Sequence, residues 1–241
     1  MKFILPLLAL LSHLVLTPRA VAAEPQPTPA ANPSARWEGE IAAMEAADKI
    51  KPPPQGGVLF IGSSTIRMWK SLATDFPQHA VINRGFGGSE IADSTFFAPR
   101  LIFPFHPQVI FLRAGGNDIH NGRSPEQVFA DYRAFVAVVH AKLPQAQIIY
   151  LGLCPTIARL KEVPQGDQLN ALIKAHTATN PLLKFVDCAD LTVGADGQPR
   201  AELFLPDKLH FNQAGYQLLA ARTRPWLPAP APKPVGSVPA N

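Results

Sequence analysis

The sequence predicts an α/β fold built on a parallel, doubly wound sheet, and three observations predict it. Five short apolar runs alternate along the chain with segments of helical pattern. The runs are almost continuously apolar, which is typical of strands covered on both faces. Because helical segments separate consecutive runs, the strands can be joined by crossovers and pair in parallel.

The expected elements follow one another in a simple order. Ser34 is a candidate cap for a first helix, which carries Trp37, Ile41 and Met44 on one face. The five expected strands come next, at 58–62, 80–85, 109–115, 148–154 and 183–188.

Two helices have clear start or end signals. One begins between the third and fourth strands, where Ser124 is the expected cap, Pro125 lies in the first turn and Gln127 closes a capping box. The other follows "HFNQAG", after the last strand, and is expected to run through Tyr216 to about Arg224. Both helices are placed where a doubly wound sheet needs a covering layer.

The two ends of the chain differ from its middle. Residues 1–23 combine Lys2, an apolar run and the small residues of "AVAA", the pattern of a cleaved secretory signal peptide. The run is shorter than the ~20 residues that span a bilayer, so we expect no stable membrane insertion. Pro-rich segments at 24–33 (a linker) and 228–241 (a tail) flank one expected domain, 34–227. These features predict a periplasmic or secreted protein.

Charge gives no sign of a nucleic acid partner. The formal net charge is +4, from 22 Lys and Arg against 18 Asp and Glu. Removal of 1–23 would take away two basic residues, Lys2 and Arg19, and no acid, which lowers the charge from +4 to +2. There is no basic run and no basic stripe with interleaved aromatic residues, so we expect no nucleic acid binding.

Two cysteines, Cys154 and Cys188, each end an expected strand. Secretion would permit a disulfide between them, and two small buried apolar side chains are the favoured alternative. No Cys or His spacing is typical of a zinc site. We therefore expect no metal and no other cofactor.

Polar and glycine residues gather where the expected strands end. "GSST" closes the first strand, "NRGFGGSE" the second and "RAGGNDIH" the third, and "LPDKLHFN" precedes the last helix. The carboxyl ends of parallel strands share one edge, where ligands bind. A serine hydroxyl at this edge becomes a nucleophile when a histidine, held by a carboxylate, takes its proton. The four segments together predict an acyl-transfer site.

Two histidines at this edge are candidate bases. His210 has Asp207 three residues earlier, close enough to orient its ring, whereas His120 follows Asn117 and is the rival base or a residue that touches substrate. Candidate donors to an oxyanion are the backbone N–H of Ser64, a glycine N–H of "GFGG" and the Asn117 amide.

Functions of other classes fit parts of the pattern. "GSSTIR" could cradle a phosphate in a nucleotide-binding protein, but a Walker pattern is missing and "DKLH" stays unexplained. "GGNDIH" suggests a metallophosphoesterase, for which the first strand offers no metal ligand. A carbohydrate-binding protein on an inactivated esterase fold would not need Ser64, Asn117, Asp207 and His210 to be intact.

Four segments carry a resemblance to a known family. "FIGSSTIRMW", "NRGFGGS", "GGND" and "DKLH" resemble, in order and spacing, the four blocks of the SGNH hydrolases, also called GDSL esterases. The likeness covers nearly all of 37–227 and looks closest to the secreted bacterial branch similar to the catalytic subunits of platelet-activating-factor acetylhydrolase. It implies a three-layer α/β/α sandwich with a five-stranded, flavodoxin-like sheet of order 2-1-3-4-5, and a serine esterase that works without a cofactor.

The resemblance also implies a role for each matching residue. The family nucleophile falls on Ser64, and the Asp-x-x-His pair falls on Asp207 and His210. The oxyanion hole would consist of Ser64, Gly88 and Asn117.

The sequence departs from the family at Ser63, which stands where the family has an aspartate before the nucleophile. The choice of Ser64 over Ser63 therefore depends on register. A secreted enzyme without an obvious lid segment would suit short acyl groups, such as acetyl esters of carbohydrates. Candidate residues for the acyl pocket, which the core could equally hold, are Trp69, Phe86, Phe96, Phe97 and Phe204.

Overall fold

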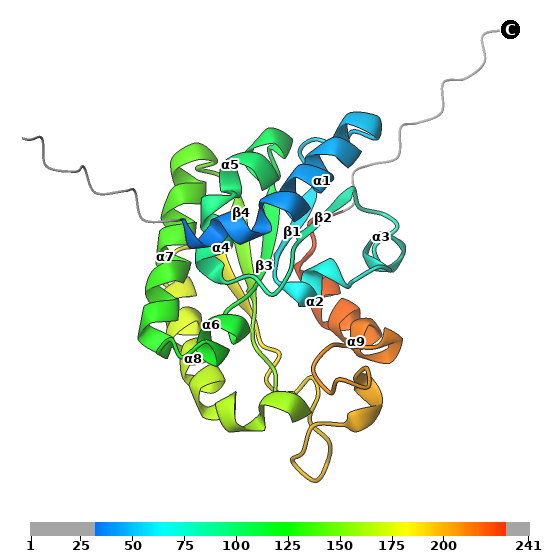
Figure 1. Ribbon diagram of the computed structural model, residues 1–241, viewed down its shortest axis with the longest axis vertical. Coiled ribbons are helices and arrows are strands. Elements are labelled where there is room, and N and C mark those ends of the chain that lie inside the picture. The colour runs from blue at the N-terminus through cyan, green and yellow to red at the C-terminus, as the bar shows by residue number, and fades with distance from the viewer. Residues whose placement is uncertain (1–31, 230–241) are drawn as a thin grey trace, which may run out of the picture. The chain divides into compact units, whose positions relative to one another are not determined.

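Five parallel strands form one sheet at the centre of the fold (Figure 1). The structure is a computed structural model that describes residues 32–229. The sheet has the order β2-β1-β3-β4-β5, so the predicted α/β class and the strand order that the resemblance implied are both confirmed. The strands are β1 (Val58–Gly62), β2 (Val81–Gly85), β3 (Val109–Arg113), β4 (Gln147–Leu151) and β5 (Leu183–Val186).

The sheet is covered on both faces because its strands are apolar on both sides. Leu59 and Ile61 of β1 belong to one core cluster, and Val58 and Phe60 belong to the other. Figure 1 shows α7 and α8 along one side of the sheet and α2 and α9 along the other. The first cluster is covered by α1 (Glu38–Ile50), α4 (Ile91–Phe96), α5 (Ala98–Leu101), α7 (Pro125–Lys142) and α8 (Val163–Thr177). The second is covered by α2 (Ser64–Arg67), α3 (Leu72–Asp75) and α9 (Gln213–Thr223).

The capping box predicted for α7 is present. The Ser124 hydroxyl accepts from the backbone N–H of Gln127 at 3.3 Å, and the Ser124 N–H donates to Gln127 Oε1 at 2.9 Å. Helix α9 ends at Thr223 and continues as a 3₁₀ turn from Arg224 to Trp226, close to its predicted end. Local side-chain chemistry therefore fixes the start of α7.

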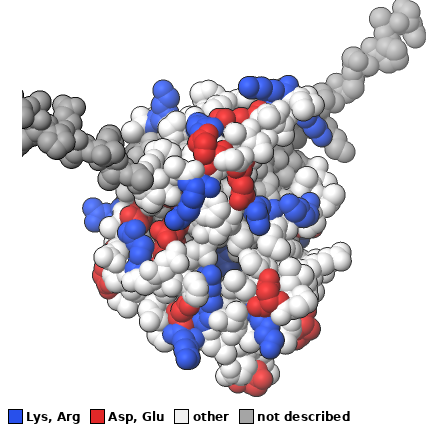
Figure 2. Space-filling view, in the orientation of Figure 1, with Lys and Arg blue, Asp and Glu red and all other residues white. Residues whose placement is uncertain are grey.

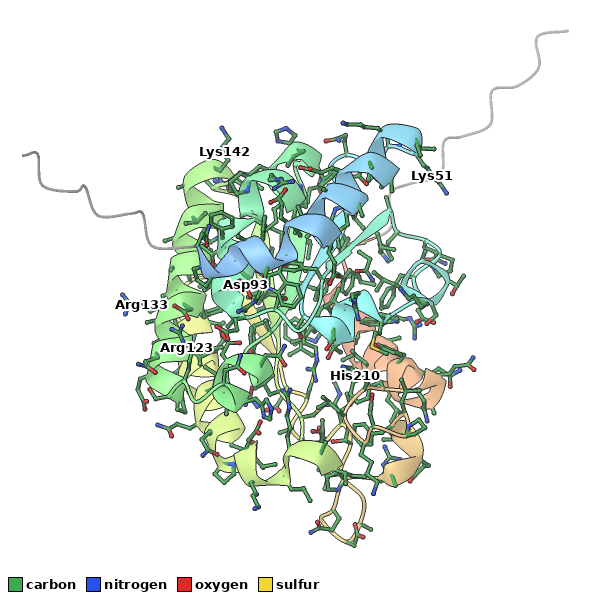
Figure 3. The ribbon with its side chains drawn as sticks, in the orientation of Figure 1. Lys51, Asp93, Arg123, Arg133, Lys142 and His210 are labelled. Carbon is green, nitrogen blue, oxygen red and sulfur yellow. The ribbon has the colours of Figure 1, made fainter. Side chains whose placement is uncertain are left out.

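The prediction for Ser34 is wrong. Ser34 lies inside a 3₁₀ helix, Pro33–Trp37, that precedes α1, and its hydroxyl donates to Asp93 Oδ1 at 2.6 Å. Asp93, labelled in Figure 3, also accepts from Trp37 Nε1 at 3.0 Å. Helix α1 begins at Glu38 with Trp37 as its N-cap residue, so Ser34 lies three residues before the capping position.

Three predicted strands extend too far at their carboxyl ends. β3 stops at Arg113 because Gly115 turns the chain with a φ of 109° and becomes the cap of α6 (Gly116–His120). β4 stops at Leu151, and the next carbonyl, of Gly152, accepts from the Arg113 side chain. β5 likewise ends at Val186. The apolar runs continue past the point where the backbone leaves the sheet.

The expectations for the two ends fall mainly outside the described residues. The signal peptide at 1–23 lies outside them, as do nearly all of the linker at 24–33 and residues 230–241 of the tail. Among residues 32–229, no helix is long and apolar enough to cross a membrane. Cys154 and Cys188 are free thiols in this structure.

Candidate active site

The loop after β1 places Ser64 at the carboxyl edge of the sheet. Gly62 has a φ of 141°, and a Cβ at this position would lie 2.0 Å from the Arg113 carbonyl oxygen. Only glycine can end β1 so close to β3. The chain then turns, Ser63 N–H donates to the Arg113 carbonyl at 3.1 Å, and Ser64 becomes the first residue of α2.

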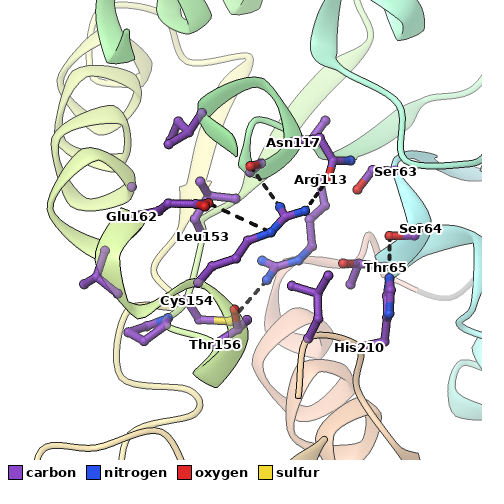
Figure 4. A pocket seen from close by; sticks show the side chains of 18 of the residues that line it. Ser63, Ser64, Thr65, Arg113, Asn117, Leu153, Cys154, Thr156, Glu162 and His210 are labelled. Atoms are coloured by element: carbon purple, nitrogen blue, oxygen red, sulfur yellow. Dashed lines mark hydrogen bonds and ion pairs between the residues drawn. The ribbon is translucent and has the colours of Figure 1, made fainter. Parts of the chain in front are cut away.

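His210 lies between Ser64 and Asp207. His210 Nε2 is 2.9 Å from Ser64 Oγ, and His210 Nδ1 is 2.7 Å from Asp207 Oδ2 (Figure 4 shows the contact with Ser64). Asp207 Oδ1 accepts from the backbone N–H groups of His210 and Leu209, both at 2.9 Å. The hydrogen bond from the His210 backbone, followed by the contact with its ring, lowers the pKa of Asp207 to about 2. The carboxylate is therefore ionised at neutral pH and orients the ring.

A tight loop brings Asp207 and His210 to this place. Lys208 takes a left-handed conformation with a φ of 58°, and its N–H donates to the Leu205 carbonyl at 2.9 Å. The Leu205 N–H in turn donates to the His210 carbonyl at 2.7 Å. The three-residue spacing of "DKLH" thus forms a closed turn in which the Asp207 side chain contacts one ring nitrogen of His210 and Ser64 contacts the other.

The rival residues lie in other environments. His120 is 55 % exposed, and its Nδ1 is 2.7 Å from Glu162 Oε1. Ser63 is buried beside Ser64, but among the described residues the hydroxyl in hydrogen-bond contact with His210 is that of Ser64. The geometry therefore favours Ser64 and His210 over Ser63 and His120.

Gly88 and the Asn117 amide lie side by side. A Cβ added to Gly88 would be 3.7 Å from Asn117 Nδ2, which also donates to the Ser89 carbonyl at 3.0 Å. Asn117 Oδ1 accepts from the Arg159 guanidinium at 3.0 Å. Because the oxygen is held by Arg159, the amide nitrogen faces the glycine. The two donors that the resemblance implied are thus neighbours.

Arg159 was not among the predicted site residues. It lies on a 3₁₀ helix, Ile157–Glu162, and donates to the Gly116 carbonyl at 2.9 Å as well as to Asn117. Burial lowers the pKa of Arg159, and the nearby Glu162, at 3.9 Å, opposes this. No sequence signal links Arg159 to Asn117, because the two residues are 42 positions apart.

A cavity opens beside Ser64 and His210 (Figure 4). Its walls come from α6, the loop after β4, the 3₁₀ helix and the start of α8. The aromatic residues considered for this pocket are not among those that line it: four belong to the core and Phe96 is 50 % exposed. The apolar part of the lining is instead mostly aliphatic: Ala114, Ile119, Leu153, Pro155, Val163 and Leu209.

A parallel α/β sheet that carries a serine, a histidine and an aspartate in hydrogen-bond contact at its carboxyl edge defines a class, the serine hydrolases. Within this class, residues 61–218 match the model of the GDSL-like lipase/acylhydrolase family. The chain belongs to this family and is a carboxylic ester hydrolase, as the resemblance predicted.

Individual proteins that are similar to this chain in sequence or structure are consistent with this family. The platelet-activating factor acetylhydrolase IB subunit alpha1 of Homo sapiens is 28% identical over 207 residues, which cover 81% of this chain and 84% of the relative. A GDSL-like lipase from Bacteroides thetaiotaomicron has a TM-score of 0.63 at 21% identity and covers 80% of this chain and 96% of its own. A mutant of Axe2, an acetyl-xylooligosaccharide esterase from Geobacillus, has a TM-score of 0.59 at 16% identity and covers 71% and 94%. The two structures support the fold.

Proposed function

We propose that this hydrolase cleaves short-chain carboxylic esters outside the cytoplasm through an acyl-enzyme on Ser64, and that acetyl esters of carbohydrates are among its substrates. The observation that carries the proposal is His210, whose two ring nitrogens contact Ser64 Oγ and Asp207 Oδ2. Export is proposed from the signal-peptide pattern of residues 1–23.

In the first half of the reaction, Ser64 Oγ attacks the ester carbonyl while His210 Nε2 takes the hydroxyl proton. The carbonyl oxygen becomes an oxyanion, for which the N–H groups of Ser64 and Gly88 and the Asn117 amide are the donors. When the intermediate collapses, His210 returns the proton to the departing alcohol. Asp207 stabilises the imidazolium in between.

In the second half, a water molecule takes the place of the alcohol. His210 removes a proton from the water, whose oxygen attacks the acyl carbon, and the same donors stabilise the second oxyanion. Collapse returns the proton to Ser64 Oγ and releases the carboxylic acid. The proposed cycle uses side-chain and backbone groups of this chain throughout.

The proposed preference for short acyl groups is supported by the names of two similar proteins and by the cavity beside Ser64. The human relative is named an acetylhydrolase, and the Geobacillus protein is named an acetyl-xylooligosaccharide esterase. Beside Asn117 the cavity is lined by Arg159, which is fixed by hydrogen bonds to Gly116 and Asn117. A small acyl group needs little room next to these fixed groups.

A labelling experiment tests the nucleophile. We expect a fluorophosphonate to form one adduct, which mass spectrometry maps to Ser64. Ser63→Ala is the matched control and should still be labelled, whereas Ser64→Ala should not. An adduct on Ser63 in the wild-type enzyme would contradict the assignment.

A substrate panel tests the acyl preference. We expect kcat/KM for nitrophenyl esters to fall steadily from acetate to laurate, and we expect acetylated xylo-oligosaccharides to be deacetylated. A maximum at long chains would contradict the short-chain proposal and leave the esterase mechanism intact.

A further inference from the structure

We propose that the ester cleaved at Ser64 carries an anionic group, such as a carboxylate, and that Arg113 binds it in the cavity. The inference rests on the proposed function of Ser64 and adds to it the charge of the substrate. The observation behind it is the environment of the Arg113 guanidinium.

Arg113 is the last residue of β3 and is 5 % exposed. Its side chain lines the same cavity as Ser64 and His210. It donates to the carbonyl groups of Leu151 and Gly152 and, at 3.1 Å, to Cys154 Sγ, a contact drawn in Figure 4. These are all neutral acceptors in the usual thiol and amide forms.

Arg113 has no carboxylate partner among residues 32–229. The other strongly buried arginine, Arg84, shows the usual arrangement, in which Asp48 lies 2.7 Å from its guanidinium. An unpaired buried charge is costly, and carbonyl groups compensate it only in part. An anion that enters the cavity would supply the missing negative charge and accept hydrogen bonds from the planar guanidinium.

The charges around the cavity agree with an anionic ligand. Arg159 adds a second guanidinium to the lining. Of the acidic residues there, Glu162 is 2.7 Å from His120 and 3.9 Å from Arg159, and Asp167 is exposed on α8. Figure 2 shows mixed charges over this face, with blue Lys or Arg atoms deep in its central hollow. The acidic side chains thus lie with other partners or in solvent and leave Arg113 unpaired.

A competing explanation is that Arg113 stabilises the oxyanion formed from every ester. The two explanations predict different effects on the ratio of kcat/KM for an anionic ester to kcat/KM for a neutral ester. If Arg113 acts on the oxyanion, its loss lowers kcat/KM equally for neutral and anionic esters. If Arg113 binds a substrate anion, its loss lowers kcat/KM mainly for the anionic ester.

Two pairs of probe esters measure this ratio. Ethyl hydrogen succinate and ethyl valerate differ by a carboxylate in the acyl part, and 4-acetoxybenzoate and 4-acetoxybenzamide differ by a charge in the alcohol part. We expect the wild-type enzyme to favour the anionic member of at least one pair by about 10-fold in kcat/KM, as hydrogen bonds to a charged group allow. The pair that shows the preference identifies the part of the substrate that Arg113 contacts.

Substitutions then locate the preference. Arg113→Met should lower the ratio by about 10-fold, and Arg113→Lys should retain part of it. The matched control is Arg133→Met, because Arg133 lies on α7 and points away from the molecule in Figure 3. The ratio does not depend on the fraction of folded enzyme, so a less stable variant still gives an answer.

Three results would overturn the proposal. One is a wild-type enzyme that hydrolyses the neutral esters without any anionic preference, which leaves the proposed function standing. Another is a ratio that Arg113→Met leaves unchanged. The third is an enzyme that hydrolyses nitrophenyl acetate but none of the four probe esters, which again leaves the proposed function standing.

Discussion

At the scale of single residues, the histidines differ in what they contact. His210 touches Ser64 and Asp207, whereas His120 touches Glu162. His210→Ala should lower kcat/KM by roughly 10⁴-fold or more, because the serine loses its base. His120→Ala should keep most of the activity. Esterase assays, with folding checked by circular dichroism, compare the two, and the opposite ranking would show that the triad is wrong.

The pH profile should report a single proton on its acid side. Hydrogen bonds lower the pKa of Asp207 to about 2, so its carboxylate stays ionised well below neutral pH. Proton removal from Ser64 needs a neutral imidazole, so kcat/KM should fall with a slope of one in a logarithmic plot as the pH decreases. A slope of two in this limb would mean that a second essential group titrates with it.

Asn117 and Arg159 should act as one unit. Asn117→Ala should lower kcat for a neutral ester by roughly 10²–10³-fold, with little change in KM, because one oxyanion donor is lost. Arg159→Met should lower kcat by about 10-fold, because Asn117 loses the partner that fixes its oxygen.

In the Asn117→Ala background, the same Arg159→Met change should have almost no further effect on kcat, since coupled residues are not additive. Independent effects in this double-mutant cycle would show that Arg159 does not position Asn117.

At the scale of elements, Asp118 joins the site to the start of α4. Its Oδ1 accepts from the backbone N–H of Ile91 at 3.1 Å, while its Oδ2 is buried without a hydrogen-bond partner. Burial raises the pKa of Asp118 to about 6, although the hydrogen bond from Ile91 opposes this. The start of α4 is therefore held by a carboxyl group that ionises less readily than an exposed aspartate.

The raised pKa makes stability depend on pH. The folded-state pKa of Asp118 lies above the ordinary aspartate value of about 4, so the contribution of this carboxyl group to stability is fully present below about pH 4 and is lost as the pH rises through about 6. Asp118→Asn should remove this dependence. The difference in unfolding free energy between wild type and variant should change by about 2–3 kcal/mol across the window in urea titrations. A constant difference would refute the assignment.

At the scale of the whole molecule, the proposed cycle assigns every chemical role to the chain itself. Exhaustive chelation should therefore leave kcat/KM unchanged in assays with and without EDTA. A loss of activity that zinc or manganese restores would instead favour the metallophosphoesterase alternative. The matched comparison is Ser64→Ala, which should be inactive whether or not metal is added.

The sequence by itself determined the fold class and the family, and it predicted where the site lies. Alternation of apolar runs and helical segments predicted the parallel sheet, and the order of "GSS", "GFGGS", "GGND" and "DKLH" predicted the family. Each of these signals lies within a short segment of sequence, so it can be recognised without knowledge of the tertiary packing. The ends of the strands were predicted less well, because apolar residues continue beyond the last ladder hydrogen bond.

Only the tertiary structure decided which side chains meet. The hydroxyl that contacts the His210 ring is that of Ser64 and not that of Ser63, although Ser64 and His210 are 146 positions apart in the sequence. Arg159 reaches Asn117 although it belongs to no motif, and Arg113, the first residue of "RAGGNDIH", ends in the cavity without a carboxylate. Such contacts depend on the crossover paths of the loops and on burial at the edge of the sheet. Both arise from packing between distant segments, which no local pattern encodes.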